Sequence, residues 1–259
     1  MSLSAAARAD FLQHERQPLF RADWLNSVFI HFSVDAEVLQ PHVPYELDLC
    51  EGKAWVSLVA FTMRGMRLWN AGRLGARLTE PIGTHGFLNV RTYVRHGEMR
   101  GIYFLREFLP NRLSVLLGPL SFGLPYRWAR VDYRNDPSEL MSCVVDPADG
   151  TSLRYCAEAP SHDYAACAPG SLDEFLLERY VAFTLHPLAK TVRDGRVGTR
   201  QPIFFRVWHP PWPQVRVRLQ LQEDSLLPHD GEWYRAARLA FATYSPGATD
   251  VWMGRPHLN

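Results

Sequence analysis

Polar side chains alternate with apolar ones between residues 89 and 95, and their types could hold a small anion. Asn89, Arg91 and Tyr93 would share one face of a strand, because successive side chains of a strand point to opposite sides. Arg95 continues the pattern at the edge of a turn. A guanidinium fixed inside a closed sheet could bind a carboxylate through two parallel hydrogen bonds. The pattern therefore indicates either an anion-binding face or an ordinary solvent-exposed strand face.

Two further titratable side chains could move protons near such a site. Glu107 follows Tyr103 and Leu105 at period-two spacing, which places all three on one face of the next strand. Facing inward, Glu107 would pair with Arg91; facing outward, it would form a cross-strand ion pair at the surface. His209 lies in an aromatic, proline-rich run, where an imidazole can shuttle protons or hold the backbone through hydrogen bonds.

The sequence lacks the residue spacings that bind metals or nucleotides. Its ten histidines and four cysteines contain no H-x-H, H-E-x-x-H or C-x-x-C motif. Neither glycine-rich phosphate loop, G-x-G-x-x-G or G-x-x-x-x-G-K-[ST], is found. We therefore expect no metal, no cofactor, and cysteines that stay reduced and buried.

Charge and composition favour a soluble protein. The 28 basic and 27 acidic side chains leave a net charge of +1, so no long-range field attracts nucleic acid or an anionic membrane. The N-terminus has no secretory signal, and the uncharged stretch over residues 113–126 is shorter than the roughly 20 apolar residues of a membrane span. We expect a cytoplasmic protein that binds neither nucleic acid nor membranes, either as a monomer or as a homo-oligomer.

Period-two alternation dominates the rest of the chain and predicts strands. The clearest run is Gln214–Gln222, in which every second residue is Val or Leu. Residues Ala54–Phe61 are apolar on both faces, so we expect a central strand that is covered on both sides. The other predicted strands are Val28–Val34, Phe87–His96, Gly101–Phe108, Arg127–Arg134, Thr151–Ala159 and Pro202–Trp208.

Helices are few, and the predicted fold class is mainly β. Ser171 and Glu174 form a capping box that predicts a helix from Leu172 to about Phe183. Because a large open sheet leaves vulnerable edges, we expect either a closed barrel or a pair of packed sheets, with a few short helices. An N-terminal helical extension would cover residues 1–20 and a single domain residues 21–259. The other predicted helices are Leu3–His14, Ala36–His42 and Arg112–Leu117.

Several blocks of the sequence together resemble one family, the YqjF-like family of uncharacterised bacterial proteins. The match spans roughly residues 20 to 255. This family is a distant relative of acetoacetate decarboxylase, so the resemblance implies a cone-shaped antiparallel β-barrel with a buried pocket. The blocks that carry it are Val28–Asp35, Glu51–Val56, Asn89–Val94, Gly101–Phe104, Leu124–Tyr126, Phe175–Tyr180 and His209–Trp212.

The resemblance also indicates which catalytic group is missing. The imine-forming lysine of the decarboxylase lies in a stretch similar to Gly118–Arg127, where the two lysine positions are here Tyr126 and Arg127. A phenol cannot form the protonated imine that takes up the electrons left by lost CO₂. The chain's two lysines, Lys53 and Lys190, lie in a predicted turn and a predicted polar loop. We therefore expect no acetoacetate decarboxylase activity through an imine.

What remains is the expectation of a barrel pocket for a small organic acid or carbonyl compound. Arg91 would anchor the acid and Tyr126, the candidate catalytic residue, would donate to a carbonyl or enolate oxygen. Enolisation, dehydration or lyase chemistry would need only acid–base groups; the alternative is a non-catalytic binding or sensor domain on an enzyme-derived fold. A carboxylate or His209 within hydrogen-bond reach of Tyr126 would favour the enzyme, and a wholly apolar, acid-free pocket would favour the binding domain. The remaining candidate binding residues are Asn89, Tyr93, Glu107, Arg127 and His209.

Overall fold

A computed structural model describes residues 2–70, 72–136, 139–159, 163–193, 196–226 and 232–258, without the side chains of residues 72–76, 78 and 187–199. Its centre is one extended sheet in the order β14-β11-β10-β5-β4-β3-β1-β13-β12-β9-β8-β7, with β2 beside β4 and β6 beside β5. The long central strands are β1 (Phe20–Val34), β3 (Ala54–Leu68), β4 (His85–His96), β5 (Met99–Leu109), β10 (Val181–Arg193), β11 (Arg196–Trp208) and β13 (Arg238–Met253). The remaining strands are β2 (Glu46–Leu47), β6 (Tyr126–Trp128), β7 (Arg130–Asp136), β8 (Glu139–Asp146), β9 (Thr151–Glu158), β12 (Val215–Asp224) and β14 (His257–Leu258).

The seven long strands pair in a ring. Six contacts follow the order β11-β10-β5-β4-β3-β1-β13, and the seventh joins β11 to β13 through Val207–Met253 and Trp208–Trp252. The expected mainly β fold is therefore present, and the β11–β13 pairing that completes the ring is only two residue pairs long. Two pairings also differ from the expected antiparallel pattern, because β5 runs parallel to β10 and to β6.

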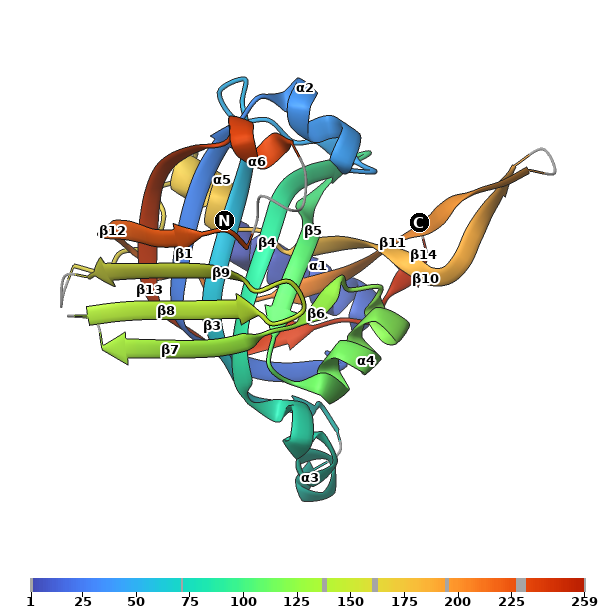
Figure 1. Ribbon diagram of the computed structural model, residues 1–259. Helices are drawn as coiled ribbons and strands as arrows, with labels where there is room; N and C mark the ends of the chain where they lie inside the picture. The colour runs from blue at the N-terminus through green and yellow to red at the C-terminus, as the bar shows by residue number, and fades with distance from the viewer. Residues whose placement is uncertain are drawn as a thin grey trace.

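A second layer covers the outside of this ring. Strands β7, β8 and β9 cross in front of β1, β3 and β4, and β12 joins them to β13 (Figure 1). One hydrophobic core lies between the two layers and includes Ile30, Leu58 and Val90. A second core lies on the other face of the same strands and includes Phe29, Val59 and Phe87. The strand Ala54–Phe61 is central and covered on both sides, as its sequence predicts.

The helices are short and lie around the sheet. Helix α4 lies beside β6, and α3 extends from the end of β3, so both flank the same end of the ring (Figure 1). None of the helices within the described residues is long and apolar enough to cross a membrane. The helices are α1 (Leu3–Glu15), α2 (Ala36–Leu39) with a 3₁₀ turn at Gln40–His42, α3 (Gly72–Gly83), α4 (Arg112–Phe122), α5 (Leu172–Leu177) and α6 (Trp233–Ala236).

Most predicted elements are present, and the errors have local causes. The Ser171 cap is confirmed because its Oγ accepts from the Glu174 amide at 3.1 Å, whereas Glu174 Oε2 accepts from the Gly170 amide at 2.7 Å rather than from Ser171. Helix α5 ends at Leu177 rather than near Phe183. The residues that follow enter β10, where pairing with β5 and β11 outweighs helix propensity. Helix α4 continues to Phe122, beyond the predicted end at Leu117, and includes Pro119. Sequence alternation missed β8, β10 and β13, as well as α3.

The four cysteines are free but only half-buried, so the expectation that they would be buried is wrong.

Candidate functional site

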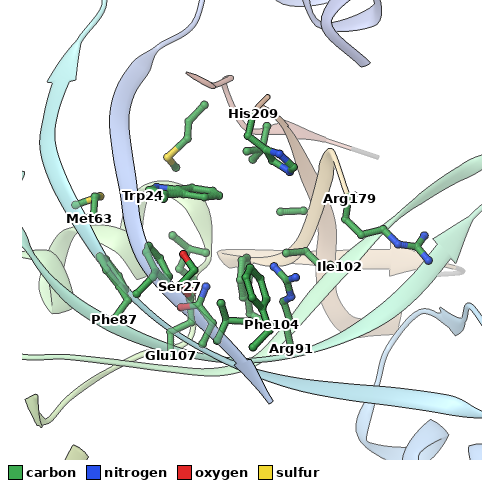
Figure 2. Close-up of a pocket in the computed structure, with 18 of the residues that line it drawn as sticks. Trp24, Ser27, Met63, Phe87, Arg91, Ile102, Phe104, Glu107, Arg179 and His209 are labelled. Carbon is green, nitrogen blue, oxygen red and sulfur yellow. The ribbon is translucent and has the colours of Figure 1, made fainter. Parts of the chain in front are cut away.

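A cavity inside the ring gathers most of the predicted site residues. Asn89, Arg91, Glu107, Tyr126 and His209 all line it, and its volume is about 70 Å³. This is several times the space needed by one water molecule, and small enough for a ligand of only a few non-hydrogen atoms. Most of the lining is apolar, which is the usual composition of a small-molecule site (Figure 2).

An extra residue in β5 turns Glu107 into the cavity. Val90 pairs with Arg106 but Arg91 pairs with Phe104, so Leu105 has no partner on β4 and forms a β-bulge. Phe104 and Glu107 consequently both line the cavity although three positions separate them. The prediction that Leu105 and Glu107 share a face is therefore wrong, because it assumed unbroken alternation.

A second bulge has the same effect in β1. Leu25 pairs with Thr62 on β3 but Val28 pairs with Ala60, so β1 has one residue more than β3 between these two pairs. Asn26, within this stretch, has a φ of 53°. Trp24 and Ser27 consequently both line the cavity, although regular alternation would have placed them on opposite faces. Ser27 alternates regularly with Phe29, which also lines the cavity, but the predicted strand began only at Val28.

Glu107 is a buried carboxyl with no charged neighbour to stabilise its ionised form. It is 3% exposed, its Oε2 has no hydrogen-bond partner, and burial alone raises its pKa well above the usual value. Burial therefore favours the protonated form of this carboxyl over the ionised form. In the strand register Glu107 lies opposite Asn89 on β4 and opposite Tyr126 on β6. Arg91 lies opposite Phe104 instead, on the other side of the bulge, and the predicted ion pair between Glu107 and Arg91 is not found among the described residues.

Tyr126 is the phenol at the position of the missing lysine, and it lines the cavity. Burial raises its pKa well above 10, and the neighbouring Glu107 carboxyl raises it further. No hydrogen bond joins these two side chains among the described residues, so both can donate to a ligand. Glu107 is the strand neighbour of Tyr126, so the pocket is not free of acids, but no described hydrogen bond to the phenol decides between an enzyme and a binding domain.

Arg91 is a buried cation without a counter-ion. It is 8% exposed, and its Nη2 donates to the carbonyl of Leu176 at 3.1 Å, while its Nε has no partner. Among the described residues no carboxylate lies within ion-pairing distance of it. Its guanidinium carbon lies 5.6 Å from the centre of the Phe29 ring. A guanidinium stays charged in proteins, so its charge is available to an anionic ligand.

A chain of hydrogen bonds behind Arg91 holds the same Leu176 carbonyl. The Tyr93 hydroxyl donates to that carbonyl at 2.9 Å and lies 2.6 Å from Ser57 Oγ, which lies 2.7 Å from His31 Nδ1. Because a carbonyl only accepts, the donors must run from His31 through Ser57 to Tyr93. Burial, then the nearby Arg91, lowers the pKa of His31 well below 6.5, so the ring is neutral. Tyr93 therefore shares the Leu176 carbonyl with Arg91 on the side away from the cavity, and it does not line the cavity.

Two further basic side chains border the cavity but carry no free charge. Arg179 Nη1 donates to Asp48 Oδ2 at 2.8 Å, and Figure 2 shows its guanidinium directed away from the cavity. His209 Nδ1 donates to the carbonyl of Pro210 at 2.8 Å, and burial lowers the pKa of His209 to about 4. His209 is therefore neutral. Arg179 was missed as a site residue, although it stands in the Phe175–Tyr180 block of the family resemblance.

The other candidate residues lie elsewhere. Arg127 is not among the cavity's lining residues, and its Nε lies 3.0 Å from Asp146 Oδ2 in an ion pair outside the ring. Lys53 is exposed in the turn before β3, and the backbone of Lys190 pairs with that of Arg200 on the β10–β11 hairpin, which extends beyond the rest of the molecule (Figure 1). No lysine is found among the described residues that line the cavity. Within the described part of the chain, no cluster of three His, Cys, Asp or Glu side chains has the arrangement of a metal site.

With this geometry established, comparison with known proteins identifies the family. The family DUF2071, an uncharacterized conserved protein, matches residues 21–249. The chain belongs to this family. Within it, the chain is similar to the uncharacterized protein YqjF of Bacillus subtilis (strain 168), with 28% identity over 200 residues, which are 75% of this chain and 74% of YqjF. The resemblance seen in the sequence is therefore confirmed.

Solved structures show the fold that this DUF2071 chain shares. Acetoacetate decarboxylase from Legionella pneumophila superposes with a TM-score of 0.64 over 94% of this chain and 88% of that chain, at 15% identity. The enduracididine biosynthesis enzyme MppR, in its complex with pyruvate, gives a TM-score of 0.63 over 93% of this chain and 90% of that chain, at 12% identity. At these identities the likeness establishes an acetoacetate decarboxylase-like fold. Any chemistry must be argued from the residues of the cavity.

Proposed function

We propose that this DUF2071 protein binds a small organic monoanion that carries a carbonyl group, inside the ring, and catalyses proton transfer on it. The observation that carries the proposal is that one cavity is lined both by Arg91, which has no carboxylate partner among the described residues, and by Glu107, whose ionised form burial disfavours. A ligand carboxylate at Arg91 would fill the missing counter-ion position. Its carbonyl oxygen would then face Tyr126 and Glu107.

The charge balance of the cavity supports a singly charged ligand. Burial disfavours the charged forms of Glu107 and His209, and Arg179 forms an ion pair with Asp48. Arg91 is thus the one uncompensated charge among the described cavity residues. Because a buried lone charge is costly, binding one carboxylate there is strongly favoured over binding a neutral molecule or a cation.

The chemistry compatible with these groups is enolisation. A carboxylate whose pKa is raised is a stronger base than an ordinary one, so ionised Glu107 can take a proton from the carbon next to the ligand's carbonyl. The C–H electron pair forms a carbon–carbon double bond, the carbonyl π pair moves to the oxygen, and the Tyr126 hydroxyl donates a hydrogen bond to the resulting enolate. Return of a proton from Glu107 to carbon completes the exchange. An imine is not required, which fits a cavity whose described lining holds no lysine.

Pyruvate in D₂O tests the proposal directly, because exchange of its methyl protons reports enolisation by loss of the ¹H NMR signal. Pyruvate is a suitable probe because MppR, which has the same fold, was solved in complex with it. We expect exchange that rises with pH as Glu107 ionises and that falls at least about 100-fold in Glu107→Gln. Glu98→Gln, at an exposed turn residue, is the matched control and should exchange normally.

Binding and catalysis separate in the same experiment. Arg91→Met should weaken pyruvate binding, measured by calorimetry, by at least about tenfold, because it removes the charge-assisted hydrogen bonds. Binding that depends on Arg91 without any exchange would leave a non-catalytic binding domain and would reject the enzyme. Equal pyruvate affinity in the wild type and Arg91→Met would reject the site itself.

A further inference from the structure

An apolar groove lies next to the cavity, between α4 and the end of β3. Its volume is about 380 Å³, against about 70 Å³ for the cavity. The groove and the cavity have five lining residues in common, so one layer of side chains forms a wall of both. These residues are Met63, Phe87, Leu124, Tyr126 and Met253.

The polar groups of the groove are satisfied, whereas those of the cavity are not. Ser121 Oγ donates to the carbonyl of Leu117 at 2.8 Å, and Ser114 Oγ lies 3.2 Å from His85 Nε2. Apart from the shared Tyr126, these two serines are the only polar residues among the described lining of the groove. The cavity, by contrast, has unpartnered polar atoms on four of its side chains, which are Ser27, Asn89, Arg91 and Glu107. The groove is therefore complementary to hydrocarbon and the cavity to a polar group.

We propose that the natural ligand is an amphipathic acid, with its carboxylate at Arg91 and an apolar tail in the groove. This inference rests on the proposed function and specifies its substrate class. Figure 2 places Arg91 on one side of the cavity and Met63 and Phe87 on the opposite side. A ligand anchored at Arg91 that extends across the cavity therefore reaches the shared wall. A tail longer than the cavity must continue between those side chains into the groove.

The shared wall is built from side chains that can move apart. Met63 and Met253 are unbranched and have three rotatable bonds each, so they adapt to a passing chain at low cost. The Tyr126 ring packs on Gly118 of α4, where a Cβ atom would stand 2.3 Å from ring carbon Cε2. The phenol is thus in contact with the groove helix while it lines the cavity. Tyr126 would separate the polar head of the ligand from its tail.

Helix α4 supplies matched variants for a test. Leu117 and Leu120 line the groove and are 41% and 57% exposed. Leu113 and Leu116 lie on the same helix with exposures of 43% and 60%, but they do not line it. The two pairs therefore differ in the groove contact and hardly at all in burial.

The experiment measures the affinity of the full-length protein for propanoate, butanoate, hexanoate and octanoate by calorimetry. We expect the affinity to rise about fourfold for each added methylene, equivalent to about 0.8 kcal/mol, until the groove is filled. The double variant Leu117→Ala/Leu120→Ala should weaken octanoate binding about tenfold and leave propanoate binding unchanged. Leu113→Ala/Leu116→Ala should behave like the wild type with all four acids.

Each other outcome contradicts a defined part of the proposal. Short acids that bind through Arg91 without any gain from chain length would overturn the amphipathic ligand and leave the proposed function standing. A chain-length gain that is lost equally in both double variants would place the tail on the leucine surface rather than in the groove. A dimer in solution that Leu117→Ala/Leu120→Ala dissociates would show that a second copy covers the groove, and would overturn the proposal. Failure of all four acids and of pyruvate to bind would reject the proposed function as well.

Discussion

The two cores on opposite faces of the central strands differ in what they bury. The core under the second layer of strands contains Ile30, Leu58, Leu88 and Val90, all at most 1% exposed. The core inside the ring is built from the alternate residues of the same strands, yet it also buries polar side chains. Those polar side chains include Ser27, His31, Ser57, Asn89, Arg91 and Glu107.

This difference separates stability from function in one set of strands. A close-packed face of hydrocarbon contributes stability through burial and dispersion. The face inside the ring gives up packing for a cavity and leaves polar atoms without partners, which costs free energy. Sites that bind or catalyse commonly carry such a cost, because their groups are arranged for a ligand rather than for the folded chain. The following predictions test this division, beginning with the largest effect.

The same Leu→Ala change should be more destabilising in the close-packed core than in the core with the cavity. Leu58→Ala creates a new void and should lower the free energy of unfolding by about 2–5 kcal/mol. Leu124→Ala only enlarges an existing cavity, so we expect about half that loss. Urea denaturation of both variants measures the difference. Equal losses would show that the cavity wall is as tightly packed as the outer core.

Glu107 should make stability depend on pH in a direction that few carboxyls show. Its pKa is raised in the folded state, so between about pH 4.5 and that raised pKa the folded chain holds a proton that the unfolded chain has lost. Stability therefore falls as pH rises through this window, by at most about 1.4 kcal/mol per pH unit. Glu107→Gln should remove this slope. Urea unfolding of both proteins from pH 5 to pH 8 measures it.

The difference between the two proteins isolates Glu107 from the other buried titratable groups. His209, whose pKa is lowered to about 4, acts in the opposite direction, because its contribution to stability increases with pH up to about 6.5. That contribution is present in both proteins and cancels in the difference. Parallel stability curves for the wild type and Glu107→Gln would mean that Glu107 is not desolvated in the folded state.

Arg91→Met should stabilise the protein slightly although it disables the site. The change removes a buried charge that has no counter-ion and keeps a side chain of similar length, so we expect a gain of about 1 kcal/mol in the free energy of unfolding. Thermal denaturation without ligand measures this gain. A loss of more than about 1 kcal/mol would show that the guanidinium holds the Leu176 carbonyl for structural reasons, and would weaken the contrast between the two faces.

The sequence predicts the fold class and most of the strands, because period-two alternation reports burial directly. It also brings Asn89, Arg91, Tyr126 and His209 to the site, partly from the pattern and partly from the family resemblance. The start of strand β10 was predicted as helix because the helix signal at Ser171 is strong. Local propensity carries no information about the parallel pairing of β10 with β5. Arg127 was expected in the cavity, but an ion pair with Asp146 holds it outside.

The polar environment of Arg91 could not be predicted from one sequence. Its support comes from residues far apart in the chain, since Leu176, Tyr93, Ser57 and His31 lie on four different elements. Among the described residues no carboxylate lies within ion-pairing distance of Arg91, and this absence also depends on strand register and on three-dimensional packing. Such features become visible only when strands are placed beside one another.

The two bulges have a consequence for how this site is inherited. Ser27 and Glu107 each share the interior with a residue three positions away, Trp24 or Phe104, because one additional residue, Asn26 or Leu105, interrupts the odd–even order of its strand relative to β3 or β4. Loss of that single residue would turn the serine or the carboxyl toward the other face while leaving its identity unchanged. In this protein the lining of the cavity therefore depends on the phase of each strand as well as on residue identity, and a one-residue deletion would change that lining as a substitution does.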